Sequence, residues 1–233
     1  MPNRLARMNP IFQKIEAVSK KTRIVTQLRE AIVSGAIEGG QQIVEAKLAQ
    51  QFGVGQGLVR EALIELEHRG FVQRTPYSGT NVSMLTFEDV LQIFEVRIEL
   101  EPLAFYLAGK NVDERNFAEL EELAEKTHIA FESKDLAGFF RSHLEFRNTI
   151  WQLSGNRYLH QELERIVVPL YALYLIRSSY NRDGLALCIE LQDKTLDAFR
   201  RKDIEQARYL ARDFLIRMKE HLRIHFVSKS QNK

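Results

Sequence analysis

The chain has little of several features that define whole classes of protein. Its 233 residues include one cysteine, Cys188, which excludes an internal disulfide and any zinc finger or ribbon built on several cysteines. No run of 18 apolar residues occurs, and the arginine-bearing start lacks the apolar stretch of a signal peptide. Repeats of 20 to 50 residues are also missing, which argues against a solenoid. We therefore expect a cytoplasmic, globular protein.

The net charge is small, but it is unevenly distributed along the chain. The formal net charge is +2, yet residues 1–84 hold 11 Lys and Arg against 7 Asp and Glu, whereas residues 85–233 hold 22 against 24. Binding of a polyanion is therefore expected from the first part of the chain. Much of this excess lies in residues 1–23, where six basic side chains face only Glu16, and we interpret this run as solvated. Residues 1–19 are expected to form a basic tail with an accessory role.

Residues 20–84 have the pattern of a winged helix-turn-helix. Apolar residues at helical spacing predict one helix from Thr22 to a glycine cap at Gly35, a second over 45–52, and a third that ends at Gly70. Two short strands, 71–74 and 80–84, then surround a turn, as in the wing of this fold. The capping sequence that begins at Thr86 marks the start of the next domain.

From there onward every segment is helical in pattern, which predicts an all-α bundle over 86–228 and a short tail over 229–233. The expected helices are 87–109, 113–133, 135–153, 157–180, 184–201 and 203–228. Pro102 and Pro169 fall inside two of them and should kink or divide them, so six to eight helices are expected. The predicted fold class is mainly α, with a small β-hairpin wing.

The second and third helices carry the motif that favours DNA binding. Ala49, Gly53 and Val59 are spaced as a helix-turn-helix requires, with a small residue at the helix contact, a glycine in the turn and an apolar plug. The third helix then presents Gly55-Gln56-Gly57, a narrow polar start that fits the major groove, with Arg60 one turn later.

Gln56 suits adenine and Arg60 suits guanine, so we expect both to read bases, with Lys47 on a phosphate. The full set of predicted DNA contacts is Lys47, Gln56, Gly57, Arg60, Gly79 and Thr80. Gly79 is expected to form the turn of the wing whatever the function. The competing interpretation of Arg60 is a surface ion pair with Glu61 or Glu65.

These stretches resemble the DNA-binding domain of GntR-family regulators. The similarity rests on 28–35 (LREAIVSG), 45–49 (EAKLA), 53–54 (GV) and 59–63 (VREAL). In that family the residues after Gly-Val usually read Ser-Arg-Thr-Pro, and Gln56 stands here in the place of a DNA-contacting arginine. The resemblance implies operator DNA as the partner, while the departure means that an operator sequence cannot be transferred from relatives.

The later sequence resembles the FadR-type branch of this family, through 95–104 (EVRIELEPLA) and 154–156 (SGN). The resemblance implies a helical domain that binds a small effector and forms a homodimer. Many members hold a divalent metal through one Asp and three His, but counting back from Gly155 places His143 and Arg147 at the first two positions, and Asp193 and Phe214 at the others. We therefore expect no metal cofactor.

In place of a metal we expect an anionic effector, a carboxylate, bound at a site made of Arg97, His143, Arg147 and Asp193. The competing interpretations are an ion pair between Arg147 and Asp193 that replaces the metal cross-link, or a surface position for both. The predicted function is an effector-responsive transcription regulator. Two alternatives stay open: a helical metalloenzyme that uses His143, Asp193 and His221, and a protein-interaction scaffold.

Overall fold

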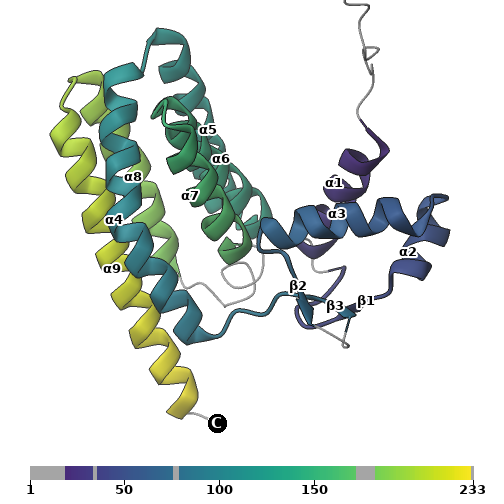
Figure 1. The fold of residues 1–233 in the computed structure, drawn as a ribbon. Helices are drawn as coiled ribbons and strands as arrows, with labels where there is room; N and C mark the ends of the chain where they lie inside the picture. Colours follow the sequence, from purple (N-terminus) through teal and green to yellow (C-terminus); the bar gives the residue numbers. More distant parts are fainter. Residues whose placement is uncertain (1–18, 34–35, 76–78, 172–181, 232–233) are drawn as a thin grey trace, which may run out of the picture.

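The computed structural model describes residues 19–33, 36–75, 79–171 and 182–231, and Figure 1 shows a small N-terminal module beside a bundle of long helices. The predicted basic tail, the cap at Gly35 and the end of the predicted helix 157–180 lie largely outside these residues. The fold class is confirmed: a helix-turn-helix with a small antiparallel sheet precedes an all-helical part.

The N-terminal module packs three helices against a three-stranded sheet. Its elements are α1 (Lys20–Val33), β1 (Gln42–Ile43), α2 (Glu45–Phe52), α3 (Gln56–His68), β2 (Val72–Thr75) and β3 (Gly79–Val82). The strand order is β1-β3-β2, with both pairs antiparallel. The sequence did not predict β1, because two residues are too few for an alternating pattern to be visible. Ile32, Val59, Leu63 and Leu66 are fully buried and form the core of the module.

The bundle consists of long helices that agree closely with the predicted ranges. They are α4 (Phe87–Asn111), α5 (Glu114–Glu132), α6 (Leu136–Leu153), α7 (Arg157–Leu170), α8 (Arg182–Arg200) and α9 (Ile204–Gln231). The last helix includes residues that we predicted to be a tail. Between residues 19 and 231, in the parts described, no helix combines the length and apolar character needed to cross a membrane.

Pro102 does not divide its helix, so of the two predicted effects, a kink or a division, the division is wrong. A proline in a helix leaves the carbonyl four residues earlier without its usual amide donor. Here that carbonyl belongs to Ile98, and the Nη1 atom of Arg212 on α9 donates to it over 3.2 Å. The neighbouring helix therefore supplies the missing hydrogen bond, and α4 continues to Asn111.

The two parts of the chain meet between α3 and α7. Gly70 follows α3 with a φ of +76°, and a Cβ atom built on it would lie 3.2 Å from Cγ of Pro169 and 3.3 Å from the carbonyl oxygen of Arg165. Val168 packs against the core of the N-terminal module. The last turns of α7 are therefore in direct contact with the domain that carries the helix-turn-helix.

Candidate DNA interface and ligand site

The turn between α2 and α3 is fixed by the local sequence. Gly53 adopts a left-handed conformation, its amide donates to the carbonyl of Gln50, and the amide of Val54 donates to that of Ala49. This pair of hydrogen bonds is the Schellman motif, in which glycine takes the left-handed position without the steric cost of a Cβ. Ala49 and Val59 are buried at the contact between the two helices, as predicted.

The first turn of α3 faces open space. Gly55, Gln56 and Gly57 are exposed, and the helix begins without a side-chain cap or an acidic residue in its first turn. A Cβ atom added at Gly55 or Gly57 would meet no atom within 4 Å. The free amides and the positive end of the helix dipole therefore point away from the protein, toward any partner that approaches.

Arg60 lies one turn farther along α3 and is held by a glutamate that sequence analysis did not select. Its Nε and Nη2 atoms donate to Oε2 of Glu45 over 3.1 and 2.8 Å. Arg74, on β2, donates to the other oxygen of Glu45 over 3.5 Å. The pair with Glu45 raises the pKa of Arg60. The expected alternatives, Glu61 and Glu65, are not the observed partners.

The remaining residues that we predicted to contact DNA differ in their exposure to solvent. Lys47 is exposed on α2, and Gly79 is exposed in the wing with a φ of +84°, which confirms its role as a turn residue. Thr80 is 4% exposed, so its side chain does not face a partner, and its selection as a side-chain contact is corrected. It was selected by its place beside the wing turn, although alternation along β3 directs it inward.

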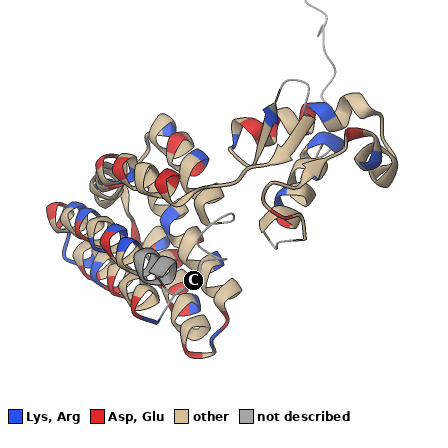
Figure 2. Cartoon of the chain, turned by 90° about the horizontal axis from the view of Figure 1, so that it is seen from below, with Lys and Arg blue, Asp and Glu red and all other residues tan. Residues whose placement is uncertain are grey.

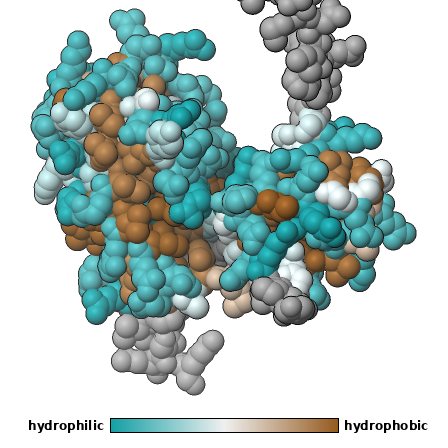
Figure 3. Space-filling model, in the orientation of Figure 1, coloured by the Kyte–Doolittle hydropathy of each residue, from teal (hydrophilic) through white to brown (hydrophobic). Residues whose placement is uncertain are grey.

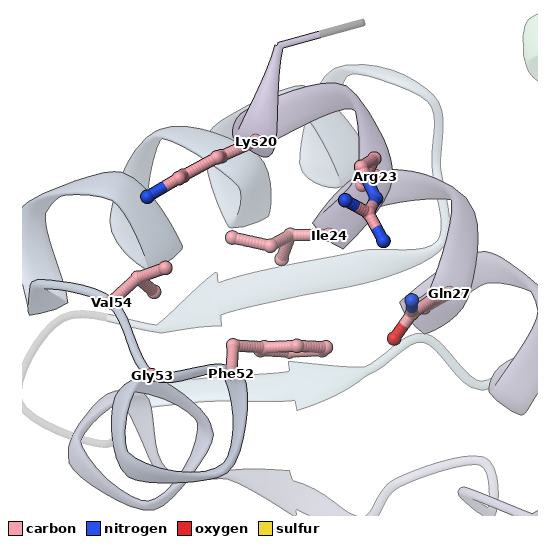
Figure 4. A pocket seen from close by; sticks show the side chains of 7 residues that line it. All are labelled: Lys20, Arg23, Ile24, Gln27, Phe52, Gly53 and Val54. Carbon is pink, nitrogen blue, oxygen red and sulfur yellow. The ribbon is translucent and has the colours of Figure 1, made fainter.

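Two basic residues that we had assigned to a solvated stretch lie beside the turn. Lys20 and Arg23, on α1, line a small pocket whose other walls include Phe52, Gly53 and Val54 (Figure 4). The sequence pattern did not single them out because they continue a basic run, and only the fold brings α1 next to the turn between α2 and α3.

A second charged cluster lies inside the bundle. Arg97 of α4 donates from Nε to Oε1 of Glu101 over 2.6 Å, and Arg147 of α6 forms an ion pair with the other oxygen of Glu101. All three side chains are at most 1% exposed. The guanidinium carbon of Arg97 lies 4.5 Å from the ring centroid of Phe94, and that of Arg147 lies 5.2 Å from the ring centroid of Phe214. The sequence pattern did not predict Glu101 as the acidic member of this cluster.

His143 lies one turn before Arg147 and is fully buried among aromatic rings. Phe139, Tyr171 and Phe214 have ring centroids 6.0, 6.1 and 6.3 Å from that of His143. Burial, with a smaller contribution from the charge of Arg97, lowers the pKa of His143 to about 3. The imidazole is therefore neutral at physiological pH.

Asp193 does not belong to this cluster. Its side chain is 52% exposed, and its Oδ1 atom lies 2.9 Å from Nε2 of His128 on α5. The preceding residue, Gln192, is fully buried and donates to Oγ1 of Thr127 over 3.3 Å. The predicted register was therefore off by one residue on α8, and the expected pair between Arg147 and Asp193 is replaced by the pair with Glu101.

The donors around His143 do not suit a divalent cation. A guanidinium cannot act as a ligand and repels a cation, and the phenyl ring of Phe214 offers no lone pair. Gln192 and His143 are the neutral donors that remain. Within the described parts of the chain, no group of three or more His, Cys, Asp and Glu is arranged to hold a metal ion.

Comparisons with known proteins agree with this arrangement. Residues 20–82 match the family described as bacterial regulatory proteins, gntR family, and residues 92–223, more than half of the chain, match the FCD domain. McbR, an HTH-type transcriptional regulator of Escherichia coli, is 28% identical over 197 residues, which cover 84% of this chain and 89% of McbR. The solved structure of McbR has a TM-score of 0.76 at 26% identity and covers 90% of this chain and 100% of that one.

Two further relatives are similar over shorter spans. YdhC, an uncharacterized HTH-type transcriptional regulator of Bacillus subtilis, is 33% identical over 141 residues, covering 60% of this chain and 63% of YdhC. The gluconate operon transcriptional repressor of Bacillus licheniformis is 31% identical over 146 residues, covering 62% and 59%. The matches thus span less than two thirds of these two relatives. All three relatives are regulators and none is an enzyme.

Proposed function

Because the chain belongs to the GntR family of bacterial regulatory proteins and carries an FCD domain, we propose that it binds operator DNA through the start of α3. In this proposal it acts in the cytoplasm as a homodimer, and its DNA affinity changes when an organic carboxylate binds in the bundle. Family membership supports the regulatory role. The contacts, the dimer and the ligand rest on the residues of this chain.

The observation that carries the proposal is the open, glycine-rich first turn of α3. A glycine inside a helix destabilises it by about 0.5–1 kcal/mol relative to alanine. Gly57 has no neighbour that its missing Cβ would touch, so packing within the chain does not require it. A close approach by another backbone does require it, and the sugar-phosphate backbone of DNA fits the uncapped amides of this turn.

Gln56 and Arg60 lie on one face of α3, where each can make a bidentate contact to one base. Arg60 exchanges Glu45 for guanine as the helix enters the groove. Arg74 pairs with the same glutamate as Arg60, Lys47 is exposed on α2, and Lys20 and Arg23 line a pocket at the turn before α3. In this proposal these basic side chains contact phosphates.

The direct test is selection of bound duplexes from a random library by the purified full chain. We expect an inverted repeat whose half-sites are about one helical turn apart. Gln56→Ala should relax the preference at one position in each half-site, whereas Gln152→Ala, which changes an exposed glutamine on α6, should not. Failure to enrich any sequence above the starting library would refute the proposal.

The homodimer is supported by an apolar seam on α4. Ile93, Val96, Leu100, Leu103 and Leu107 repeat at alternating intervals of three and four residues, the spacing by which helices pair. Val96 is 47% exposed and Leu103 is 38% exposed, which is unusual for two such residues on one helix face. Figure 3 shows the corresponding apolar band along the exposed face of the bundle.

The seam is nearly symmetric about Leu100. In an antiparallel pair, Leu100 meets Leu100 of the second copy, Ile93 meets Leu107, and Val96 meets Leu103, as a twofold axis requires. Figure 2 shows Lys and Arg interspersed with Asp and Glu along the helices of the bundle.

Cysteine cross-linking tests this pairing. Leu100→Cys should form a disulfide-linked dimer under mild oxidation, and Val96→Cys should cross-link efficiently only when mixed with Leu103→Cys. Ile129→Cys, at a more exposed apolar site on α5, is the control. Cross-linking of Val96→Cys to itself would indicate a parallel pair, and cross-linking at none of the α4 positions would exclude this interface.

The end of α7 connects the ligand site to the DNA-binding module. The ring of Tyr171 lies 6.1 Å from His143, and Pro169, two residues earlier, touches the position of Gly70 after α3. A ligand that displaces Tyr171 therefore moves the segment on which α3 rests. This is the physical link by which differential binding at one site biases the other.

A further inference from the structure

The ion-pair network around Arg60 contains two arginines but has no net charge. Oxygens of Glu45, on α2, accept hydrogen bonds from both Arg60 and Arg74, and Glu67 lies 3.9 Å from Nε of Arg74. Two positive and two negative side chains thus form one network. We propose that Glu45 is a specificity-determining residue, which withholds Arg60 from phosphates and thereby favours guanine over the DNA backbone as the partner of Arg60.

Ion pairs are distributed unevenly over the basic residues of the N-terminal module. In the described part of the chain, Lys20, Arg23 and Lys47 pair with no carboxylate. These are residues that we expect at phosphates, where a free positive charge attracts any duplex. Arg60, the residue that we expect to read a base, instead has its charge compensated. Attraction to DNA of any sequence and reading of a base are therefore assigned to different side chains.

The geometry of the pair holds Arg60 more firmly than a single surface contact would. Nε and Nη2 of Arg60 donate to Oε2 of Glu45, and Nε also lies 3.4 Å from Oε1. The carboxylate is the less exposed partner, at 23% against 57%. A surface ion pair in water is weak on its own, but two hydrogen bonds within a network of charges strengthen it. Any partner of Arg60 must therefore compete with Glu45.

Glu45 makes this competition unequal for a phosphate and for guanine. A phosphate that takes Arg60 brings its negative charge next to the carboxylate that Arg60 has left, and like charges repel. The O6 and N7 atoms of guanine accept two hydrogen bonds without adding a charge. Arg74 compensates the released carboxylate, because its Nη2 atom lies 3.5 Å from Oε1 of Glu45 and 3.4 Å from the carbonyl oxygen of Arg60. Loss of the charge of Glu45 should therefore favour phosphates in particular.

The inference rests on the proposed function in taking α3 as the surface that meets DNA. We would measure binding of the full chain to a duplex of random sequence by fluorescence anisotropy, over a series of salt concentrations. Glu45→Gln keeps the side-chain shape and one acceptor oxygen but removes the charge. We expect it to bind this duplex about threefold to tenfold more tightly at low salt, with a slope of log affinity against log salt that is steeper by about one, as for one more phosphate contact.

Glu65→Gln is the matched control, because Glu65 also lies between two cations of this module. It is 2.7 Å from Lys21 and from Arg69 and is 27% exposed, on the side of α3 that faces α1. The variant changes the net charge of the module by the same amount, but it should show little gain in affinity and no change in slope. A gain in Glu65→Gln equal to that in Glu45→Gln would show a general effect of charge and overturn the inference.

Two further measurements separate the withholding of Arg60 from a structural role of Glu45. In an Arg60→Ala background, Glu45→Gln should gain no more affinity for the random duplex than Glu65→Gln does, since no Arg60 remains to be released. Duplexes selected by Glu45→Gln should show a weaker preference at the position read by Arg60. A gain of full size without Arg60, or unchanged affinity and slope in Glu45→Gln, would overturn the inference. Failure of the unmodified chain and the variant alike to bind any duplex would reject the proposed function as well.

Discussion

The chain uses the same arrangement of two arginines about one glutamate twice, in opposite surroundings. In the N-terminal module Glu45 lies between Arg60 and Arg74, and the side chain of Arg60 is 57% exposed. In the bundle Glu101 lies between Arg97 and Arg147, and none of the three is more than 1% exposed. The buried cluster has one positive charge in excess, whereas Arg74 of the exposed cluster also pairs with Glu67 over 3.9 Å.

Solvent makes the difference between the two clusters. Water screens the exposed cluster, so its ion pairs contribute little to folding and are easily exchanged for a base or a phosphate. The buried cluster is desolvated, so removing one member leaves a charge that nothing else in the core compensates. The exposed cluster is suited to reversible binding of a partner, and the buried cluster is suited to a ligand that is enclosed in the core.

Substitution of the two glutamates should therefore change the stability of the chain by very different amounts, and this difference tests the comparison most strongly. Glu101→Ala should lower the free energy of unfolding by about 3–5 kcal/mol, because it leaves two buried guanidinium groups without their carboxylate. Glu45→Ala should leave stability nearly unchanged. Urea denaturation of both variants measures the difference, and a similar small loss in both would show that the buried cluster is hydrated.

The histidine beside the buried cluster predicts a dependence of stability on pH. The pKa of His143 is about 3 in the folded state and about 6.5 when unfolded, so the unfolded chain binds the proton more tightly between these values. Stability is then complete above pH 6.5 and falls as the pH drops, by about 2 kcal/mol at pH 5. His143→Gln should remove this part of the slope in denaturation series, whereas His128→Gln, at a partly exposed site, should retain it.

The contact between the two regions can be tested at Gly70. Alanine there requires a positive φ and places Cβ against Pro169 and a carbonyl, so Gly70→Ala should destabilise the chain by about 1–2 kcal/mol. It should also weaken the response of operator affinity to ligand, measured by anisotropy. An unchanged ligand response in a folded variant would contradict the role of α7.

Substitution of Gly57 on α3 should give the smallest change in stability, and it should stabilise the chain instead of destabilising it. Gly57→Ala should stabilise the chain by about 0.5–1 kcal/mol, because alanine favours the helix and nothing obstructs its Cβ. The same change should weaken DNA binding if the backbone of DNA approaches this position. A stabilised variant with full operator affinity would remove the argument that Gly57 serves the interface.

The sequence predicted helices and turns well because these depend on local signals. The spacing of apolar residues located α2 and the bundle helices, and Gly53 marked the turn of the motif. The sequence did not reveal which charges meet. Glu45 and Arg60 are 15 residues apart, and Glu101 and Arg147 lie on different helices, so their pairing depends on the tertiary fold. An error of one residue on α8 exchanged the buried Gln192 for the exposed Asp193, because neighbouring helical residues face different directions.

The most direct test of the account compares Arg60 with an arginine in an equivalent setting outside the motif. Arg200 of α8 pairs with Glu121 over 2.7 Å and is 61% exposed, close to the value for Arg60. Operator affinity of Arg60→Ala and Arg200→Ala would be measured by fluorescence anisotropy at one salt concentration. The account predicts a loss of about tenfold to a hundredfold for Arg60→Ala and none for Arg200→Ala. Equal affinities for the two variants would contradict the claim that α3 reads DNA.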